Sequence, residues 1–240
     1  MTDYKLKIEV LEGIVIRTVT GESLSFTKRK AAAIICYLAL CKNGTASRES
    51  VAGLLWSDRS EEQARASLRQ CIKYLRSVFD KLEFKVFTAN RNDLELDTSL
   101  SSLDLFEYSR MLDGGEVPAG ILEDRADPER ILRGYESLDH SFAAWLQIVR
   151  QQVHDEFVEK LERIMRSPAS SADLTLRAAK SLTQLDPTHE EARRFVIQSY
   201  AERGNTTAAL KEYNQLWELL DEQYDMEPAE ETELLIADVK

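Results

Sequence analysis

The hydrophobic period of the 240-residue chain changes three times, and this order constrains the fold more than any other feature. Apolar and polar residues alternate over the first 27 residues, as in Leu6, Ile8 and Val10, and they alternate again over 84–97. The segments between and after these stretches have the 3.6-residue period of α-helices. The sequence therefore predicts short antiparallel strands, a group of helices, a hairpin and then a long helical part.

Capping residues mark three helices between the strands and the hairpin. Thr27 is expected to cap the first helix, and Ser47 the second. Ser60 and Gln63 form a capping box at the start of the third helix, which we expect over 61–79. Strands, three helices and a hairpin in this order are typical of a winged helix with an N-terminal antiparallel sheet.

The third predicted helix carries two stripes with helical spacing. Its apolar residues are Leu68, Ile72, Leu75 and Phe79. Its cations are spaced by four, four and three residues: Arg65, Arg69, Lys73 and Arg76. A solvated face with pairs such as Glu61–Arg65 is one explanation of the cations, and a phosphate backbone is the other.

Other cationic features fall where a winged helix contacts DNA. Lys28, Arg29 and Lys30 begin a helix, where the macrodipole disfavours positive charge and a phosphate would compensate it. Ser47 and Arg48 open the second helix with backbone N–H groups that can hold a phosphate. These features favour DNA binding over a solvated face.

The tip of the predicted hairpin and the third helix complete this interface. Arg91 lies at the tip, where a wing reaches a DNA groove. We expect Arg65, Arg69 and Lys73 to face the major groove, with Arg and Lys suited to guanine and Gln70 suited to adenine. Sequence leaves open which of them contact bases and which contact phosphates.

The charge of the chain is divided unevenly. The formal net charge is −11, with +3 in residues 1–97 and −14 in the remainder. Such a split favours two domains with different partners. We expect a DNA-binding domain over 1–100 and a helical domain over 101–240, joined by the small polar stretch TSLSSL at 98–103.

The second domain is expected to be helical throughout. Its long amphipathic segments are joined by short turns and lie at 138–166, 171–185, 189–203 and 206–221. Thr188 and Glu191 form a capping box before the third of them. The stretch YAERGNTTAALKEYNQL has a glycine turn and small residues at tetratricopeptide-like spacing. These segments predict stacked antiparallel hairpins.

Two long stretches resemble one family of bacterial regulators. They are KRKAAAIICYLALCKNGTASRESVAGLLWSDRSEEQARASLRQCIKYLRSVF and LDPTHEEARRFVIQSYAERGNTTAALKEYNQLWELL. Both are similar to the SARP class of transcriptional activators, which joins an OmpR-type winged helix to a bacterial transcriptional activation domain. The resemblance implies a homodimer on direct repeats of double-stranded DNA, with the RNA polymerase holoenzyme as a further partner.

The sequence argues against catalysis, a metal site or a cofactor. The three histidines are far apart, and GEVPAGI has Ile121 where a phosphate-binding loop requires lysine. We expect a cytoplasmic protein, because no apolar run approaches the ~18 residues of a membrane span and the N-terminus lacks a signal peptide. An apolar face that starts at Leu234 and is cut short by Lys240 suggests a piece of a longer regulator. The rival hypothesis is a helical-repeat scaffold or signalling adaptor that binds a protein and has a winged helix without DNA-binding activity.

Overall fold

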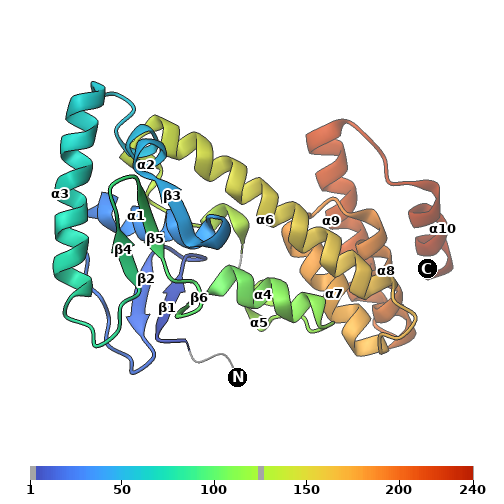
Figure 1. Cartoon of the computed structure of the whole chain (residues 1–240). Coiled ribbons are helices and arrows are strands. Elements are labelled where there is room, and N and C mark those ends of the chain that lie inside the picture. The colour runs from blue at the N-terminus through green and yellow to red at the C-terminus, as the bar shows by residue number, and fades with distance from the viewer. Residues whose placement is uncertain (1–3, 124–126, 240) are drawn as a thin grey trace. The chain divides into compact units, whose positions relative to one another are not determined.

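The computed structural model describes residues 4–123 and 127–239 (Figure 1). The strands are β1 (Leu6–Glu9), β2 (Val15–Thr18), β3 (Thr45–Ser47), β4 (Phe87–Ala89), β5 (Asp93–Leu96) and β6 (Ser101–Leu103). The α-helices are α1 (Arg29–Leu40), α2 (Arg48–Leu55), α3 (Glu61–Phe79), α4 (Asp104–Asp113), α5 (Ala119–Leu122), α6 (His140–Arg166), α7 (Ala172–Leu185), α8 (Glu190–Glu202), α9 (Thr206–Tyr224) and α10 (Glu230–Val239). Short 3-10 turns lie at Lys42–Gly44, Pro128–Arg130 and Glu136–Leu138.

The chain forms two compact units, and neither is a single continuous segment. The first comprises Met1–Glu107 and Pro128–Val153, and the second comprises Tyr108–Asp127 and His154–Lys240. The strands and α1–α3 therefore belong to the same unit as the first half of α6. The division of the chain into domains at residue 100 remains a prediction.

The first sheet has the strand order β2-β1-β6. β1 pairs antiparallel with β2, with Ile8 opposite Ile16, as the alternating pattern predicts. β1 also pairs in parallel with β6, with Ile8 opposite Leu103. The expectation that 98–103 is only a link is wrong for Ser101–Leu103, because these residues complete the sheet.

The second sheet forms the wing and has the order β3-β5-β4. The predicted hairpin is β4–β5, in which Phe87 pairs with Leu96. The sequence did not predict β3, which pairs antiparallel with β5 through Ala46 and Leu94. The wing is thus tied to the residues that directly precede α2.

The apolar core of the first unit is built around α1. Its side chains Ile34, Ile35 and Leu38 are fully buried. The predicted cap of α1 is wrong, because Lys28 occupies the N-cap position and makes no side-chain capping bond. Thr27 instead donates its backbone N–H to the Tyr74 hydroxyl at 2.8 Å, which ties the start of α1 to α3.

The second unit is helical over its described residues, and α8 packs against α7, α9 and α10. Helices α6–α9 correspond to the four predicted segments, with ends shifted by a few residues. The predicted Thr188 capping box is wrong, because His189 occupies the N-cap position of α8 and its Nδ1 accepts from the Ala192 N–H at 3.2 Å. Among the described residues, no helix is long and apolar enough to cross a membrane.

Candidate nucleic-acid interface

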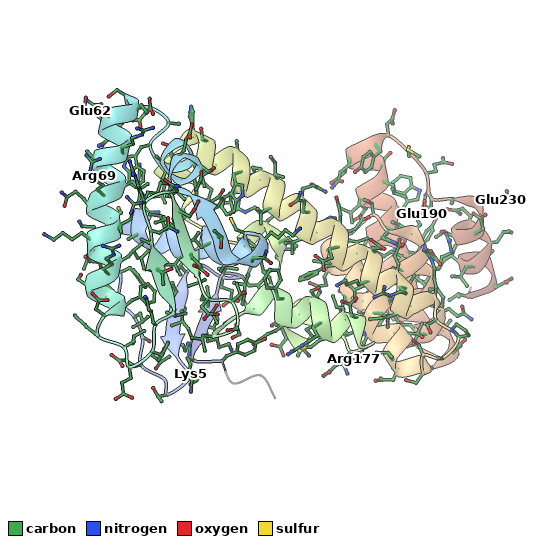
Figure 2. The ribbon with its side chains drawn as sticks, viewed as in Figure 1. Lys5, Glu62, Arg69, Arg177, Glu190 and Glu230 are labelled. Carbon is green, nitrogen blue, oxygen red and sulfur yellow. The ribbon has the colours of Figure 1, made fainter. Side chains whose placement is uncertain are left out.

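Helix α3 separates its apolar residues from its cations. Leu68, Ile72, Leu75 and Phe79 are at most 5% exposed. The opposite surface is exposed and carries Arg65, Arg69, Gln70, Lys73 and Arg76. The predicted faces of this helix are therefore confirmed, and Figure 2 shows Arg69 on its exposed surface. The roles of these side chains in DNA binding remain predictions.

The start of α3 is fixed by its cap, and its first cation is paired. The Ser60 hydroxyl accepts from the Gln63 N–H at 3.4 Å, as predicted. Arg65 forms an ion pair with Glu61 one turn earlier, and both side chains are exposed. Such a pair contributes only about 0.3–0.5 kcal/mol. A phosphate could therefore replace Glu61 as the partner of Arg65 at small cost.

The next two cations of α3 have no such partner. Within residues 4–123 and 127–239, neither Arg69 nor Lys73 makes a hydrogen bond or an ion pair. Both side chains stand on the exposed surface of one helix, one turn apart. The positive charges of Arg69 and Lys73 repel each other, and an anion bound between them would offset this repulsion.

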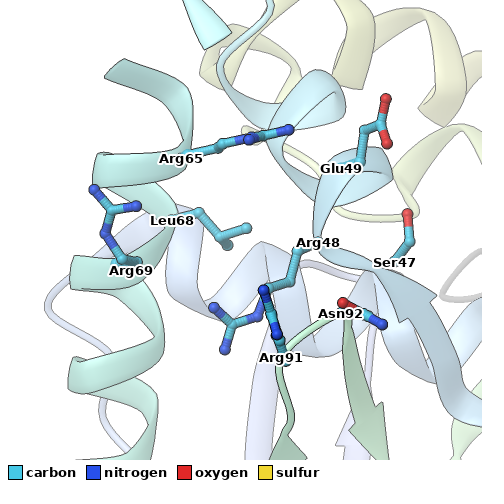
Figure 3. A pocket seen from close by; sticks show the side chains of 8 residues that line it. All are labelled: Ser47, Arg48, Glu49, Arg65, Leu68, Arg69, Arg91 and Asn92. Carbon is cyan, nitrogen blue, oxygen red and sulfur yellow. The ribbon is translucent and has the colours of Figure 1, made fainter. Parts of the chain in front are cut away.

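A groove lies between α3, the start of α2 and the tip of the wing (Figure 3). Its lining residues are Ser47, Arg48, Glu49, Arg65, Leu68, Arg69, Arg91 and Asn92. A second groove along α3 is lined by Arg48, Arg69, Ile72, Lys73, Arg76, Ser77 and Asp80. Arg48 and Arg69 line both grooves, so the basic surface is continuous from the wing tip to the end of α3.

The start of α2 contributes the Arg48 side chain, while the Arg48 N–H is bonded within the protein. Ser47 caps the helix by accepting from the Ser50 N–H at 3.0 Å. The Arg48 N–H donates to the Asn92 carbonyl of the wing at 2.7 Å, so it is not available to a phosphate. The Arg48 side chain lines both grooves, and its buried Nε has no hydrogen-bond partner among the described residues. The charge at this position therefore comes from the side chain.

The wing tip is a turn fixed by Asn90. The Asn90 Oδ1 accepts from the N–H groups of Asn92 at 2.8 Å and Asp93 at 2.7 Å. Arg91 lies between Asn90 and Asn92, at the tip of the hairpin as predicted, and its side chain is exposed. Local hydrogen bonds of this kind give a short polar turn a defined shape. The turn thus presents Arg91 at a fixed edge of the groove.

The cations Lys28 and Arg29 at the start of α1 have partners inside the protein. The Lys28 ammonium lies 5.3 Å from the centre of the Tyr74 ring. Arg29 donates to the Gly134 carbonyl, and its guanidinium lies 4.8 Å from the centre of the Tyr135 ring. The sequence suggested that a phosphate stabilises these positive charges at the helix start. The Tyr74 and Tyr135 rings and the Gly134 carbonyl already do so in part. The DNA-binding roles of Lys28 and Arg29 remain predictions.

Sequence reasoning missed the role of Arg76 and Tyr74 in shaping this surface. Arg76 donates to the Ala89 carbonyl of β4 at 2.7 Å and so ties α3 to the wing. The Tyr74 hydroxyl accepts from Thr27, as described above. Their positions on the polar face of α3 could have suggested a contact, but no local pattern indicates the partner.

The fold and this surface define a class: a winged helix with a basic groove, followed by a helical domain. Residues 130–240 match the family of bacterial transcriptional activator domains. The structure is similar to that of Mycobacterium tuberculosis EmbR in complex with a low-affinity phosphopeptide, with a TM-score of 0.66 and 15% sequence identity. The match covers 98% of this chain and 65% of that chain. A search of curated proteins finds no match.

These comparisons confirm the predicted fold and support the predicted SARP-type class. Residues 130–240 match the bacterial transcriptional activator domain family, and the structure has a winged helix with an N-terminal sheet before an all-α domain. At 15% identity, the likeness to EmbR concerns the fold. The chain spans about two thirds of the length of that structure's chain.

Proposed function

We propose that the chain is a sequence-specific DNA-binding transcription regulator that acts as an activator. The observation that carries this proposal is the convergence of Arg48, Arg65, Arg69 and Arg91 on one groove between α2, α3 and the wing. These residues come from three separate parts of the chain, although the whole protein has a net charge of −11. A polyanion such as DNA is the ligand that such a surface attracts.

In this proposal, α3 lies in the major groove and the wing follows the backbone beside it. Arg69 and Lys73 contact base edges or phosphates, and Gln70 suits adenine. Arg48 sits between helix and wing, where it would hold the phosphate that both elements approach. We include Lys28, Arg29 and Ser47 as contacts at the margin of the interface.

The activator part of the proposal is supported by the family match over residues 130–240. On this basis a homodimer binds direct repeats in the cytoplasm and recruits the RNA polymerase holoenzyme. Direct repeats should be separated by about one helical turn, 10–10.5 base pairs. Selection from random duplexes by the full chain would reveal such repeats, and a set of unrelated sequences would contradict sequence specificity.

The test of DNA binding compares two triple variants of the full chain. The first replaces Arg65, Arg69 and Lys73 with alanine. The second is the matched control and replaces the exposed cations Arg110, Arg203 and Lys211 of the helical unit. Both remove three positive charges, so a general charge effect would be the same in each.

We expect the first variant to lose at least about a hundredfold in affinity for a selected duplex, since single contacts contribute roughly 1–3 kcal/mol. The slope of log affinity against log salt concentration should also fall, because fewer counterions are released. The control should bind like the unmodified chain. Unchanged affinity in the first variant, with its helix content intact, would contradict the proposal and favour the protein-binding scaffold.

A further inference from the structure

The turn between α2 and α3 determines how α3 is presented to DNA. It covers residues 56–60, between the end of α2 at Leu55 and the start of α3. Lys30 of α1 holds its first residues: the ammonium donates to the Leu55 carbonyl and lies 5.0 Å from the centre of the Trp56 ring. Trp56 is only 5% exposed, so this side of the turn is packed into the core.

The other side of the turn is held by Asp139, a residue far away in sequence. The Asp139 carboxylate accepts from the Ser57 N–H at 2.9 Å and from the Ser57 hydroxyl at 2.6 Å. It also accepts from the Ser141 N–H at 2.9 Å, in the first turn of α6. One carboxylate therefore caps α6 and restrains the turn before α3. Asp139 and Ser57 belong to the same compact unit.

Asp139 is itself anchored, because the segment before it is bound both to the winged helix and to α6. The Leu132 N–H donates to the Val10 carbonyl at 2.8 Å. Arg150 of α6 is 4% exposed and donates to the Ile131 carbonyl through Nε at 3.1 Å and through a terminal nitrogen at 2.8 Å. The contact of Arg29 with Gly134 and Tyr135 adds a third attachment.

The charge on Asp139 strengthens this restraint. Partial burial works against the charged form, but hydrogen bonds from Ser57 and Ser141 and the nearby Lys30 ammonium leave the pKa of Asp139 below its ordinary value. The carboxylate is therefore ionised at neutral pH. Hydrogen bonds to a charged acceptor are roughly twice as strong as neutral ones.

We propose that Asp139 is a positioning residue for DNA recognition, which acts through Ser57 to fix the turn between α2 and α3. Asp139 lies inside the part of the chain that matches the activator-domain family. DNA binding by the winged helix therefore depends on a segment beyond residues 1–100. A partner or signal that displaces residues 128–141 would weaken DNA binding without touching the DNA. This inference rests on the proposed function.

The test uses Asp139→Asn in the full chain. Asparagine keeps one acceptor oxygen and is a good helix N-cap, so α6 retains its start. Its amide nitrogen cannot accept the Ser57 N–H, so this hydrogen bond is lost, while the remaining oxygen can still accept from the Ser57 hydroxyl. Asp173→Asn is the matched control, since Asp173 is an exposed aspartate in the first turn of α7.

Two measurements, hydrogen exchange and DNA affinity, distinguish a failure of this inference from a failure of the proposed function. Hydrogen exchange should become about tenfold faster in residues 56–60 of Asp139→Asn, since losing one charged hydrogen bond favours local opening by roughly that factor. It should be unchanged in Asp173→Asn. Unchanged exchange in Asp139→Asn would overturn the inference even if the chain binds DNA.

Affinity for a selected duplex should fall about tenfold in Asp139→Asn, the equivalent of roughly 1.4 kcal/mol. Ser57→Ala, which removes only the hydroxyl contact, should lower it less. In the background of Asp139→Ala, which removes both acceptor oxygens, Ser57→Ala should cause no further loss, because the Ser57 hydroxyl then has no carboxylate partner. Full affinity in Asp139→Asn, or a further loss when Ser57→Ala is added to Asp139→Ala, would overturn the positioning role. No DNA binding by the unmodified chain would overturn the proposed function and this role with it.

Discussion

The Arg76 guanidinium donates to the backbone carbonyl of Ala89 at 2.7 Å. This bond joins the last turn of α3 to β4, the first strand of the wing hairpin. Arg76 belongs to the same cationic stripe as Arg69 and Lys73, yet its charge is directed at the protein's own backbone. The stripe therefore combines side chains that are free to bind a ligand with one that fixes the shape of the surface.

Arg76→Ala should loosen the wing without unfolding the protein. The free energy of unfolding should fall by only about 0.5–1.5 kcal/mol, the net value of one hydrogen bond. Hydrogen exchange should become faster in residues 87–93 and stay unchanged in α9. Lys81→Ala, which removes an exposed cation just beyond α3, is the control and should leave the wing unaffected. Equal exchange in both variants would show that the bond does not hold the wing.

Leu75→Ala and Arg69→Ala should have different effects on stability, because they lie on the buried and the exposed face of α3. Leu75 is 0% exposed, so its truncation should lower the free energy of unfolding by roughly 2–5 kcal/mol. Arg69 is exposed, and its replacement should change stability by no more than about 0.5 kcal/mol. Urea denaturation of both variants measures this difference. A large loss of stability in Arg69→Ala would mean that the cationic face is structural.

Gly44→Ala should be strongly destabilising. Gly44 has a φ of 68°, and an added Cβ would collide with the Leu96 carbonyl of the wing. We expect a loss of about 2–4 kcal/mol, from the left-handed backbone and from the steric clash together. Thermal and urea denaturation would measure it.

Gly53→Ala is the opposite case and serves as the control. Gly53 lies within α2, and an added Cβ there would have nothing within 4 Å. Alanine in a helix interior is favoured over glycine by about 0.5–1 kcal/mol, so this variant should be more stable than the unmodified chain. Equal stability changes at the two positions would contradict the backbone geometry described for Gly44.

The pH dependence of stability should carry a signature of Asp104. Its carboxylate accepts from the N–H groups of Val10 at 2.9 Å, Leu11 at 3.1 Å and Leu105 at 2.9 Å. Burial disfavours the charge more than these bonds favour it, and it raises the pKa of Asp104 to about 6 from its ordinary value of 3.8. The folded protein then binds this proton more tightly than the unfolded chain. The contribution of Asp104 to stability therefore falls as the pH rises from about 4 to about 6.

Asp104→Asn removes this titration. Between pH 4 and pH 7, the unfolding free energy of the unmodified chain should fall by about 2 kcal/mol relative to that of the variant. Taking the difference between the two proteins cancels the other titrating groups, several of which have lowered pKa values. Urea denaturation at a series of pH values measures it. If the unmodified chain instead becomes more stable relative to Asp104→Asn as the pH rises, the three hydrogen bonds outweigh the effect of burial.

Much of the local structure follows from the sequence alone. The alternation of Leu6 and Ile8 predicts β1, and the spacing of Leu68, Ile72 and Leu75 predicts the buried face of α3. Such patterns are sufficient because the side-chain direction in a helix or strand is set by backbone geometry, which repeats every 3.6 or two residues. The exposure of the cations on α3 follows from the same geometry.

Only the tertiary structure determined which residues meet across long stretches of chain. The polar sequence of β6 has no alternating pattern, and it becomes a strand because β1 offers an open edge for parallel pairing. Thr27 looks like a helix cap but bonds to Tyr74 instead. Asp139 restrains Ser57 across 82 residues. A hydrogen bond between distant residues depends on where the whole chain brings their atoms, and no local period encodes that position.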